Sequence, residues 1–227
     1  MMIMNDSSSN QMRFQAVWSS CNVPPRLAEA CFDKYQPTCS EQGRALEKCR
    51  KFAAGGLENI HQGRGLFLQG PVGTGKSHLA VATVWTIVEN NIEYFGRPAS
   101  GMVLAGEPVY EGLNCFMVSV VDLLGLLRES FNAENLKVRA RGLLHRVRAD
   151  AIVILDDIGA EKPSDWVEEQ LYGIIDLRYR MQRSTIFTTN CTLKQLESQI
   201  GSRVVSRIFE MCEGVKVEGE DWRKRGL

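Results

Sequence analysis

The stretch GLFLQGPVGTGKSHLAVATVWTIVEN, residues 65–90, decides the fold of this chain. Its opening, GLFLQG, is a short apolar run of the kind that forms a buried strand, and its closing part, 78–90, has the amphipathic pattern of a helix. The loop between them, GPVGTGKS (70–77), matches the pattern G-x-x-x-x-G-K-[ST]. A glycine-rich loop between a strand and a helix points its backbone amides at phosphate, so the stretch predicts a nucleotide-binding loop in an α/β fold.

Each residue type in this loop has a chemical role. Glycine lets the backbone wrap closely around phosphate, the Lys76 ammonium can reach the β- and γ-phosphates, and the Ser77 hydroxyl can ligate magnesium. ATP and Mg²⁺ are therefore the expected cofactors. The residues expected to bind ATP are Gly70, Pro71, Val72, Gly73, Thr74, Gly75, Lys76, Ser77 and His78. The alternative, a chance glycine-rich turn, does not account for the strand before it and the helix after it.

Acidic and amide side chains end two further apolar runs. AIVILDD (151–157) predicts a strand that lies next to the strand of the phosphate-binding loop, with Asp156 holding magnesium through water and Asp157 polarising the attacking water. STIFTTN (184–190) predicts a strand ending at Asn190, which can orient that water. The alternatives are structural, because carboxylates often end strands and Asn190 lies in the N-cap region of a helix that begins at Thr192.

Two arginines lie four residues apart in RVVSRIFEMC (203–212), so Arg203 and Arg207 share one face of a predicted helix. A guanidinium, often from a neighbouring subunit, neutralises charge on the γ-phosphate during hydrolysis, and both arginines are candidates for that catalytic role. The alternative is a surface arginine pair that binds Glu210 or another neighbouring carboxylate.

A basic run, LKVRARGLLHRVR (136–148), interleaves cations with apolar residues at helical spacing. Lys plus Arg and Asp plus Glu are each 27, so the chain has no net charge and this run is its densest positive segment. It can follow the backbone of single-stranded DNA. The alternative is the solvated face of an amphipathic helix packed on the sheet. The candidate DNA-binding residues are Lys137, Arg139, Arg141, Arg146 and Arg148.

Composition excludes several classes of protein. With 227 residues, 44% of them hydrophobic and 24% charged, the chain is neither disordered, collagen-like nor a disulfide-stapled miniprotein. No apolar run approaches the roughly 18 residues that a membrane helix needs, and no signal peptide is indicated. The seven cysteines form no CxxC, which favours reduced thiols in a cytoplasmic protein over a metal shared by Cys21, Cys31, Cys39 and Cys49.

We expect three parts along the chain: a disordered lead (1–10), a helical segment (11–63) that supplies the adenine pocket and a partner contact, and an ATPase domain (64–227). A stretch rich in glycine and proline, 93–114, predicts an inserted loop or small hairpin. In the ATPase domain, apolar runs alternate with amphipathic stretches, which predicts a parallel sheet with helices on both faces. The predicted strands are 65–70, 115–120, 151–157 and 184–190.

In this order, the motifs resemble those of the AAA+ ATPases of the DnaC/DnaI bacterial helicase-loader family, which also includes IstB-type transposition helpers. The resemblance covers about residues 20–225. Beyond the phosphate-binding loop it is specific in VDLL (121–124), ILDDIGAEKPSDWVEEQLYGIIDLRY (154–179), SRVVSRIFEMC and GEDWR (219–223). It implies a P-loop AAA+ fold, with Lys76 and Ser77 as nucleotide and magnesium contacts.

The resemblance also implies roles for the acids and arginines. Asp156 and Asp157 correspond to the acid pair, and Asn190 corresponds to the first sensor. Arg207 matches the arginine finger that acts on the ATP of a neighbouring subunit, with Arg203 in support. The helix around 134–149 corresponds to the extra helical element through which such loaders contact single-stranded DNA.

The sequence departs from the family pattern at several points. The acid pair is Asp-Asp, whereas many AAA+ proteins carry Asp-Glu, so Asp157 is one methylene shorter and slow hydrolysis is expected. The zinc-binding N-terminal module of some loaders has no counterpart in the first 63 residues. The C-terminal lid is expected to be nearly absent, and Arg223 is the candidate for a second sensor.

The function implied is that of an ATPase that uses ATP to switch self-association and single-stranded DNA contact while it helps to place a hexameric replicative helicase on DNA. The expected partners are the helicase, single-stranded DNA and further copies of the chain, with no membrane. Two alternatives stay open. One is an IstB-type transposition helper that binds duplex DNA and a transposase, and the other is a nucleotide-binding adaptor with negligible turnover.

Overall fold

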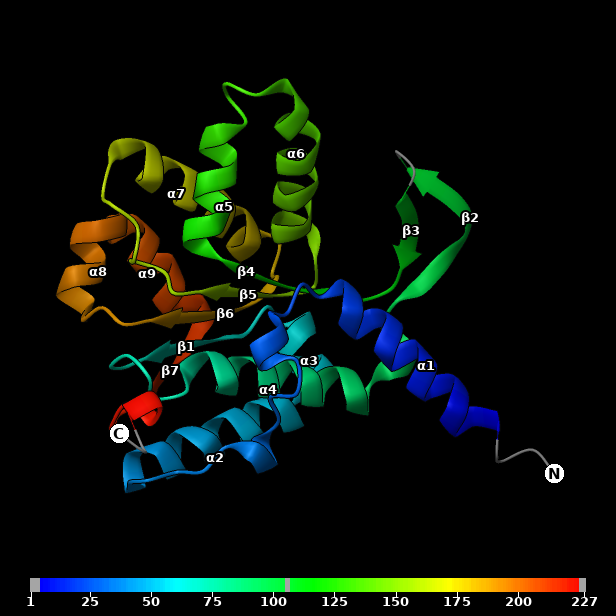
Figure 1. Ribbon diagram of the computed structural model, residues 1–227, viewed down its shortest axis with the longest axis horizontal. Coiled ribbons are helices and arrows are strands. Elements are labelled where there is room, and N and C mark those ends of the chain that lie inside the picture. The colour runs from blue at the N-terminus through cyan, green and yellow to red at the C-terminus, as the bar shows by residue number, and fades with distance from the viewer. Residues whose placement is uncertain (1–4, 105–106, 225–227) are drawn as a thin grey trace.

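A sheet of parallel strands forms the centre of the protein, in a computed structural model that describes residues 5–104 and 107–224, with side chains over 9–96 and 112–223. Five strands pair in the order β4-β5-β6-β1-β7 within these residues, and helices cover both faces (Figure 1). The predicted parallel sheet is therefore confirmed. The strands are β1 (Gly65–Gln69), β4 (Cys115–Ser119), β5 (Ile152–Asp156), β6 (Ser184–Thr189) and β7 (Cys212–Lys216).

The N-terminal helices and the helix after the phosphate-binding loop cover one face. Leu66 and Leu68 of β1 are fully buried in this layer together with Leu79 of the loop helix. Within the described residues, the short 3-10 helices are η1 (Pro25–Leu27), η2 (Phe32–Lys34) and η3 (Ile92–Tyr94), which connect other elements, and η4 (Trp222–Lys224), which follows β7. The α-helices of this half are α1 (Asn5–Ser20), α2 (Ser40–Ala54), α3 (Gly56–His61) and α4 (Lys76–Asn90).

Five helices cover the opposite face. Successive side chains of a strand point to opposite faces, so Phe67 of β1 and Phe187 of β6 are buried in this second layer. The basic run 136–148 lies within the second helix of this set. The helices are α5 (Val120–Glu129), α6 (Glu134–Ala149), α7 (Asp165–Arg180), α8 (Leu193–Ile200) and α9 (Ser202–Met211).

The order of the strands corrects one expectation. The acid-tipped strand β5 does not lie next to β1, because β6 lies between them and pairs with both. Every residue of β6 is buried, as expected of the middle strand in a parallel sheet that helices cover on both faces. As a result, the residues that follow β6 lie between the acids after β5 and the loop after β1.

The predicted disordered lead is wrong for residues 5–10, which form the first turns of α1, while residues 1–4 lie outside the described residues. The helix is anchored further along. Phe14 and Trp18 contact the Trp85 ring of α4 at centroid distances of 4.5 and 4.8 Å. Once these turns are fixed, each residue added toward the N-terminus gains a hydrogen bond without a new nucleation cost.

The insert forms the small hairpin that its glycines and prolines predict. Strands β2 (Arg97–Leu104) and β3 (Glu107–Glu111) pair antiparallel, with residues 105–106 outside the description, and the hairpin projects away from the central sheet (Figure 1). At the other end of the domain, β7 is a strand that the sequence does not predict. Only Val215 is buried among its residues, so no apolar run marks it.

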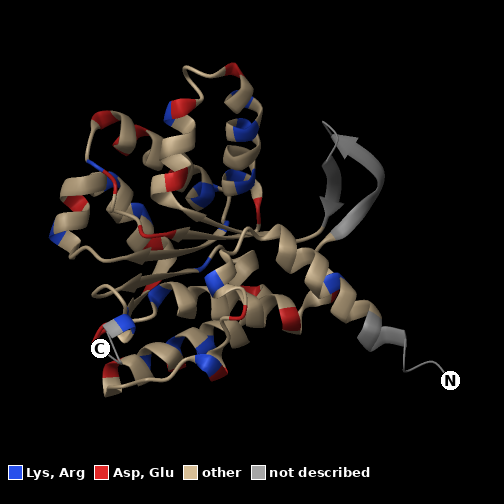
Figure 2. Cartoon of the chain, in the orientation of Figure 1, with Lys and Arg blue, Asp and Glu red and all other residues tan. Residues whose placement is uncertain are grey.

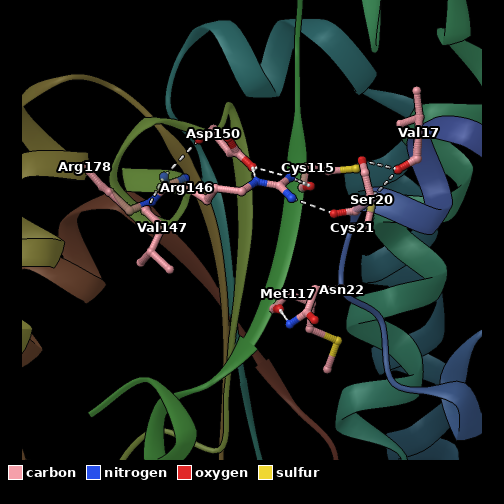
Figure 3. Close-up of polar contacts among 10 residues, drawn as sticks. All are labelled: Val17, Ser20, Cys21, Asn22, Cys115, Met117, Arg146, Val147, Asp150 and Arg178. Atoms are coloured by element: carbon pink, nitrogen blue, oxygen red, sulfur yellow. Dashed lines mark hydrogen bonds and ion pairs between the residues drawn. The ribbon is translucent and has the colours of Figure 1, made fainter. Parts of the chain in front are cut away.

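Two arginines fix the end of the sheet at which the strands begin (Figure 3). Arg178 of α7 is fully buried and donates to the carbonyls of Val147 (2.9 Å), Asp150 (2.9 Å) and Ser184 (2.6 Å) and to the Thr185 hydroxyl (2.9 Å). It thereby joins the C-terminal end of α6 to the start of β6. Burial lowers the pKa of Arg178 to about 9.

Arg146 makes the second set of connections. Its guanidinium pairs with Asp150 at 2.7 Å and donates to the carbonyls of Ser20 (2.6 Å) and Cys115 (3.0 Å) (Figure 3). It also lies over the Phe116 ring. These contacts join α6 to the end of α1 and to the start of β4. The orientation of α6 on the sheet is therefore set by its own basic side chain.

The cysteines are free thiols. No group of three or more His, Cys, Asp or Glu side chains gathers as a metal site within the part of the chain that the structure describes. In the same residues, no helix is both long enough and apolar enough to cross a bilayer.

We predict that Arg178→Met lowers the free energy of unfolding by about 3–5 kcal/mol, measured by urea titration, because four buried acceptors lose their donor. The control is Arg180→Met on the same helix. That side chain is 63% exposed and pairs with Asp176, so its loss should cost at most about 1 kcal/mol. Equal losses from the two variants would contradict the anchoring role of Arg178.

Candidate nucleotide-binding site

The loop after β1 requires glycine at two positions. Gly73 and Gly75 have φ angles of 79° and 91°, in the left-handed region that other residues rarely adopt. A Cβ on Gly75 would lie 2.5 Å from the Tyr35 ring, and one on Gly73 would overlap the Asp221 carboxylate. The loop therefore has the compact, glycine-dependent backbone that the sequence predicts.

The ammonium group of Lys76 lies within this loop. It donates to the carbonyls of Gly70 (2.8 Å) and Pro71 (2.6 Å), and Lys76 is only 7% exposed. Burial lowers the pKa of Lys76 to about 8, although Asp157 and Asp156 act in the opposite direction. The loop therefore holds the amine of Lys76 beside the carbonyls of Gly70 and Pro71.

Asp156, the last residue of β5, connects this strand to α4 and to β6. Its Oδ1 accepts hydrogen bonds from the Ser77 hydroxyl at the start of α4 and from the Thr188 hydroxyl near the end of β6, both at 2.7 Å. The two residues expected to hold magnesium, Ser77 and Asp156, are therefore in direct contact. Thr188 is a site residue that the sequence does not predict, although it lies in TTN (188–190) with Asn190.

Asp157 and Asn190 also meet. The Asn190 Nδ2 donates to Asp157 Oδ1, so the amide side chain contacts the acid rather than capping α8, whose N-cap is Thr192. Asp157 has a φ angle of 60°, and its N–H donates to the Thr188 hydroxyl at 2.8 Å. Burial, and secondly the charge of Asp156, raise the pKa of Asp157 above its usual value.

Segments from both ends of the chain contact the loop. The Tyr35 hydroxyl donates to the Thr74 carbonyl at 2.9 Å, and His78 Nε2 lies 2.8 Å from the Cys31 carbonyl. From the other end, the Trp222 N–H donates to the Gly73 carbonyl at 3.0 Å. These contacts had no sequence signal beyond the expectation that residues 11–63 supply an adenine pocket.

The two arginines of α9 line one hollow on the surface. It has a volume of about 560 Å³ and is lined by Tyr172, Ser202, Arg203, Ser206 and Arg207. Arg207 pairs with Asp176 (3.3 Å) and Glu210 (3.5 Å), which is the surface pairing named above as the alternative. Arg207 thus contacts α7 and its own helix, and Arg203 is exposed beside it. Arg223, the candidate second sensor, pairs with Asp221 at 3.0 Å.

The predicted DNA-binding residues differ in exposure and in their contacts. Lys and Arg positions recur along α6 (Figure 2). Arg139 and Arg141 are exposed, and Lys137 pairs with Glu134. Arg148 is half-buried, with its Nε shielded from solvent. Arg146 uses its donors on Asp150, Ser20 and Cys115, so its place in the predicted DNA-facing set is corrected: helical spacing did not show that this face of α6 packs on α1 and β4.

The strand order, the glycine-rich loop after β1, the acids after β5 and the asparagine after β6 together define a P-loop nucleotide-binding protein of the AAA+ class. Residues 85–226, more than half of the chain, match the family described as IstB-like ATP binding protein. The chain belongs to this family of IstB-like ATP-binding proteins.

Its relatives include replicative helicase loaders. The chain is 22% identical to the replicative helicase loader DnaC of Escherichia coli (strain K12) over 203 residues, which is 89% of this chain and 72% of that protein. It is 26% identical to the replicative helicase loader DnaI of Bacillus subtilis (strain 168), over 71% of this chain and 48% of that protein. A crystal structure of the DnaC helicase loader is similar with a TM-score of 0.68 and 31% identity, over 86% of this chain and 99% of that one.

We predict that ATP affinity is full near neutral pH and falls as the pH rises through about 8, where burial places the pKa of Lys76. Phosphate pairs with the protonated amine, so binding above that pKa requires proton uptake and weakens by up to about tenfold per pH unit. Calorimetry between about pH 6.5 and about pH 9.5 measures this. In Lys76→Arg the guanidinium stays charged, so its affinity should not vary. A flat wild-type profile would contradict the assignment.

Proposed function

We propose that this protein is an ATP-dependent loader of a replicative DNA helicase. The observation that carries the proposal is the meeting of Lys76, Ser77, Asp156, Asp157 and Asn190 at one edge of the sheet, in a chain similar to helicase loaders over most of its length. The similarity supports the partner, and the meeting of these side chains supports the use of ATP.

The residues of the loop fit a magnesium nucleotide. Gly73 and Gly75 leave the loop free of side chains at its turns, Lys76 supplies a shielded cation, and the Ser77 hydroxyl already contacts the Asp156 carboxylate. We assign triphosphate binding to the loop amides and Lys76, and magnesium binding to Ser77 and Asp156. When bound, magnesium ATP supplies the phosphoanhydride bond that hydrolysis breaks.

Hydrolysis is assigned to Asp157 and Asn190. The Asp157 carboxylate would accept a hydrogen bond from the attacking water, and Asn190, held on Asp157 Oδ1, would orient that carboxylate. The raised pKa of Asp157 makes it a better proton acceptor near neutral pH than an ordinary aspartate. Its short side chain supports slow turnover.

Self-association would bring a second copy to the hollow that Arg203 and Arg207 line. In the single chain, Arg207 is held by Asp176 and Glu210 and lies 4.5 Å from the centre of the Tyr179 ring. A triphosphate from a neighbouring subunit carries more negative charge than these carboxylates and would draw the guanidinium away from them. Arg207 would then act on the neighbour's ATP, and nucleotide would favour the assembled state.

Single-stranded DNA is assigned to the exposed part of α6 and the turn before it. Arg139 and Arg141 can contact phosphates, and Phe131 and Val138, exposed by 67% and 73%, offer apolar surface for bases. The other members of the predicted set are engaged or half-buried, so two arginines carry this assignment.

The second candidate function is that of a transposition helper, which the name of the IstB-like family favours. Capture experiments with the purified protein and magnesium ATP separate the two. Retention of a replicative helicase and stimulation of its transfer onto single-stranded DNA would support the loader. Retention of a transposase, with no helicase and a preference for duplex DNA, would overturn it.

We predict that replacing Arg139 and Arg141 by Ala weakens single-stranded DNA binding and reduces the slope of log K against log salt by about 1.4, since each lost phosphate contact contributes about 0.7. Fluorescence anisotropy at several salt concentrations measures this. The control replaces Arg26 and Arg44, which are exposed on elements outside α6, and should leave affinity and slope unchanged. An unchanged slope in the α6 variant would favour a solvated helix face.

A further inference from the structure

The hydroxyl of Thr188 contacts both residues of the acid pair. Thr188 is 1% exposed, its Oγ1 donates to Asp156 Oδ1 at 2.7 Å, and the same oxygen accepts the Asp157 N–H at 2.8 Å. The proton of this hydroxyl is therefore used on Asp156, the last residue of β5, and one of its lone pairs is used on Asp157, which follows that strand. This contact fixes a side chain in one case and a backbone in the other.

The hydroxyl lies where the backbone pairing of β5 and β6 stops. The regular ladder ends at Leu155 and Phe187, and the next backbone bond between the two segments is from the Ile158 N–H to the Thr188 carbonyl at 2.9 Å. Asp156 and Asp157 lie in the interval between these bonds. In this interval the Thr188 side chain makes the hydrogen bonds to β5 and the residue after it, one to the Asp156 carboxylate and one from the Asp157 N–H.

Asp157 needs such support because of its backbone. Its φ angle of 60° lies in the left-handed region, which a residue with a side chain keeps only when its surroundings hold it there. The bond from its N–H to Thr188 acts directly on this conformation. Its carboxylate in turn meets the Asn190 amide, so the position of the proposed catalytic acid depends on a hydroxyl two residues before Asn190.

Ser77 contacts the same carboxylate oxygen as Thr188. In this structure the Ser77 hydroxyl shares Asp156 Oδ1 with Thr188. A Ser77 hydroxyl that held magnesium would do so through an oxygen lone pair and would keep its proton for Asp156. Thr188 holds the same oxygen from the side of β6 and also binds the Asp157 N–H.

We infer that Thr188 is a positioning residue for ATP hydrolysis, whose hydroxyl aligns the Asp156 carboxylate and the Asp157 backbone. This inference rests on the proposed ATPase function. The proposed role is to align the two acids and not to bind nucleotide. Loss of the Thr188 hydroxyl should therefore lower kcat and leave ATP affinity nearly unchanged.

The test is steady-state ATP hydrolysis by Thr188→Val and Thr188→Ser in the full chain, with DNA and helicase present. Val keeps the shape but has no hydroxyl, and kcat should fall by about tenfold to a hundredfold, as for a slightly misplaced catalytic group, while the Kd for ATP changes less than about threefold. Ser keeps the hydroxyl and should retain kcat within about threefold. Thr188→Ala, also without a hydroxyl, carries the same expectation as Val should the Val variant fail to fold.

The control for loss of a buried hydroxyl is Thr83→Val in α4, where a fully buried Thr donates to the Leu79 carbonyl of its own helix. It should leave kcat unchanged. Normal turnover in folded Thr188→Val or Thr188→Ala, or equal loss in Thr188→Ser, would overturn the positioning role while leaving the proposed ATPase intact. A wild-type protein without turnover in the presence of DNA and helicase would overturn both.

Discussion

A buried carboxylate must be given hydrogen-bond donors, and at Asp156 this requirement ties the nucleotide-binding edge together. Its Oδ1 takes one donor from Ser77 at the start of α4 and one from Thr188 near the end of β6. Three segments that are distant in the sequence therefore meet at one oxygen atom. The meeting places Asp157 beside Asn190 and within electrostatic reach of Lys76.

The two edges of the sheet are stabilised by different chemistry. At the edge where strands end, hydroxyls, carboxylates and an amide contact one another and leave groups for ligand binding. At the edge where strands begin, Arg146 and Arg178 use their donors on backbone carbonyls and Asp150 (Figure 3). Because the five strands of the central sheet are parallel, the end held by Arg146 and Arg178 and the end with the nucleotide-binding residues are separated by the full length of the strands. Helix α7 contributes Arg178 to the first of these ends, and its Asp176 contacts Arg207.

The parts of this structure that the sequence predicts are those with local patterns. The loop with Lys76, the acids after an apolar run and the hairpin each depend on residues close together in the chain. The position of β6 between β5 and β1 was not predictable, because strand order is decided by burial across the whole sheet. Arg146 matched Arg139 in spacing, yet only packing against Ser20, 126 residues away, distinguishes them. The sequence predicts Asn190 but not Thr188, because a buried hydroxyl has no sequence signature of its own.

The contacts of Tyr35 and Trp222 with the phosphate-binding loop determine when the loop is completed during folding. Tyr35 lies 39 residues before Thr74, whereas Trp222 lies 149 residues after Gly73. The contact of Trp222 forms late, since the entropy of closing the long intervening chain must be overcome first. During synthesis from the N-terminus, the loop cannot gain its last support until the segment with Trp222 has left the ribosome. A nascent chain therefore completes this loop only after the 149 residues that follow Gly73, up to Trp222, have been synthesised.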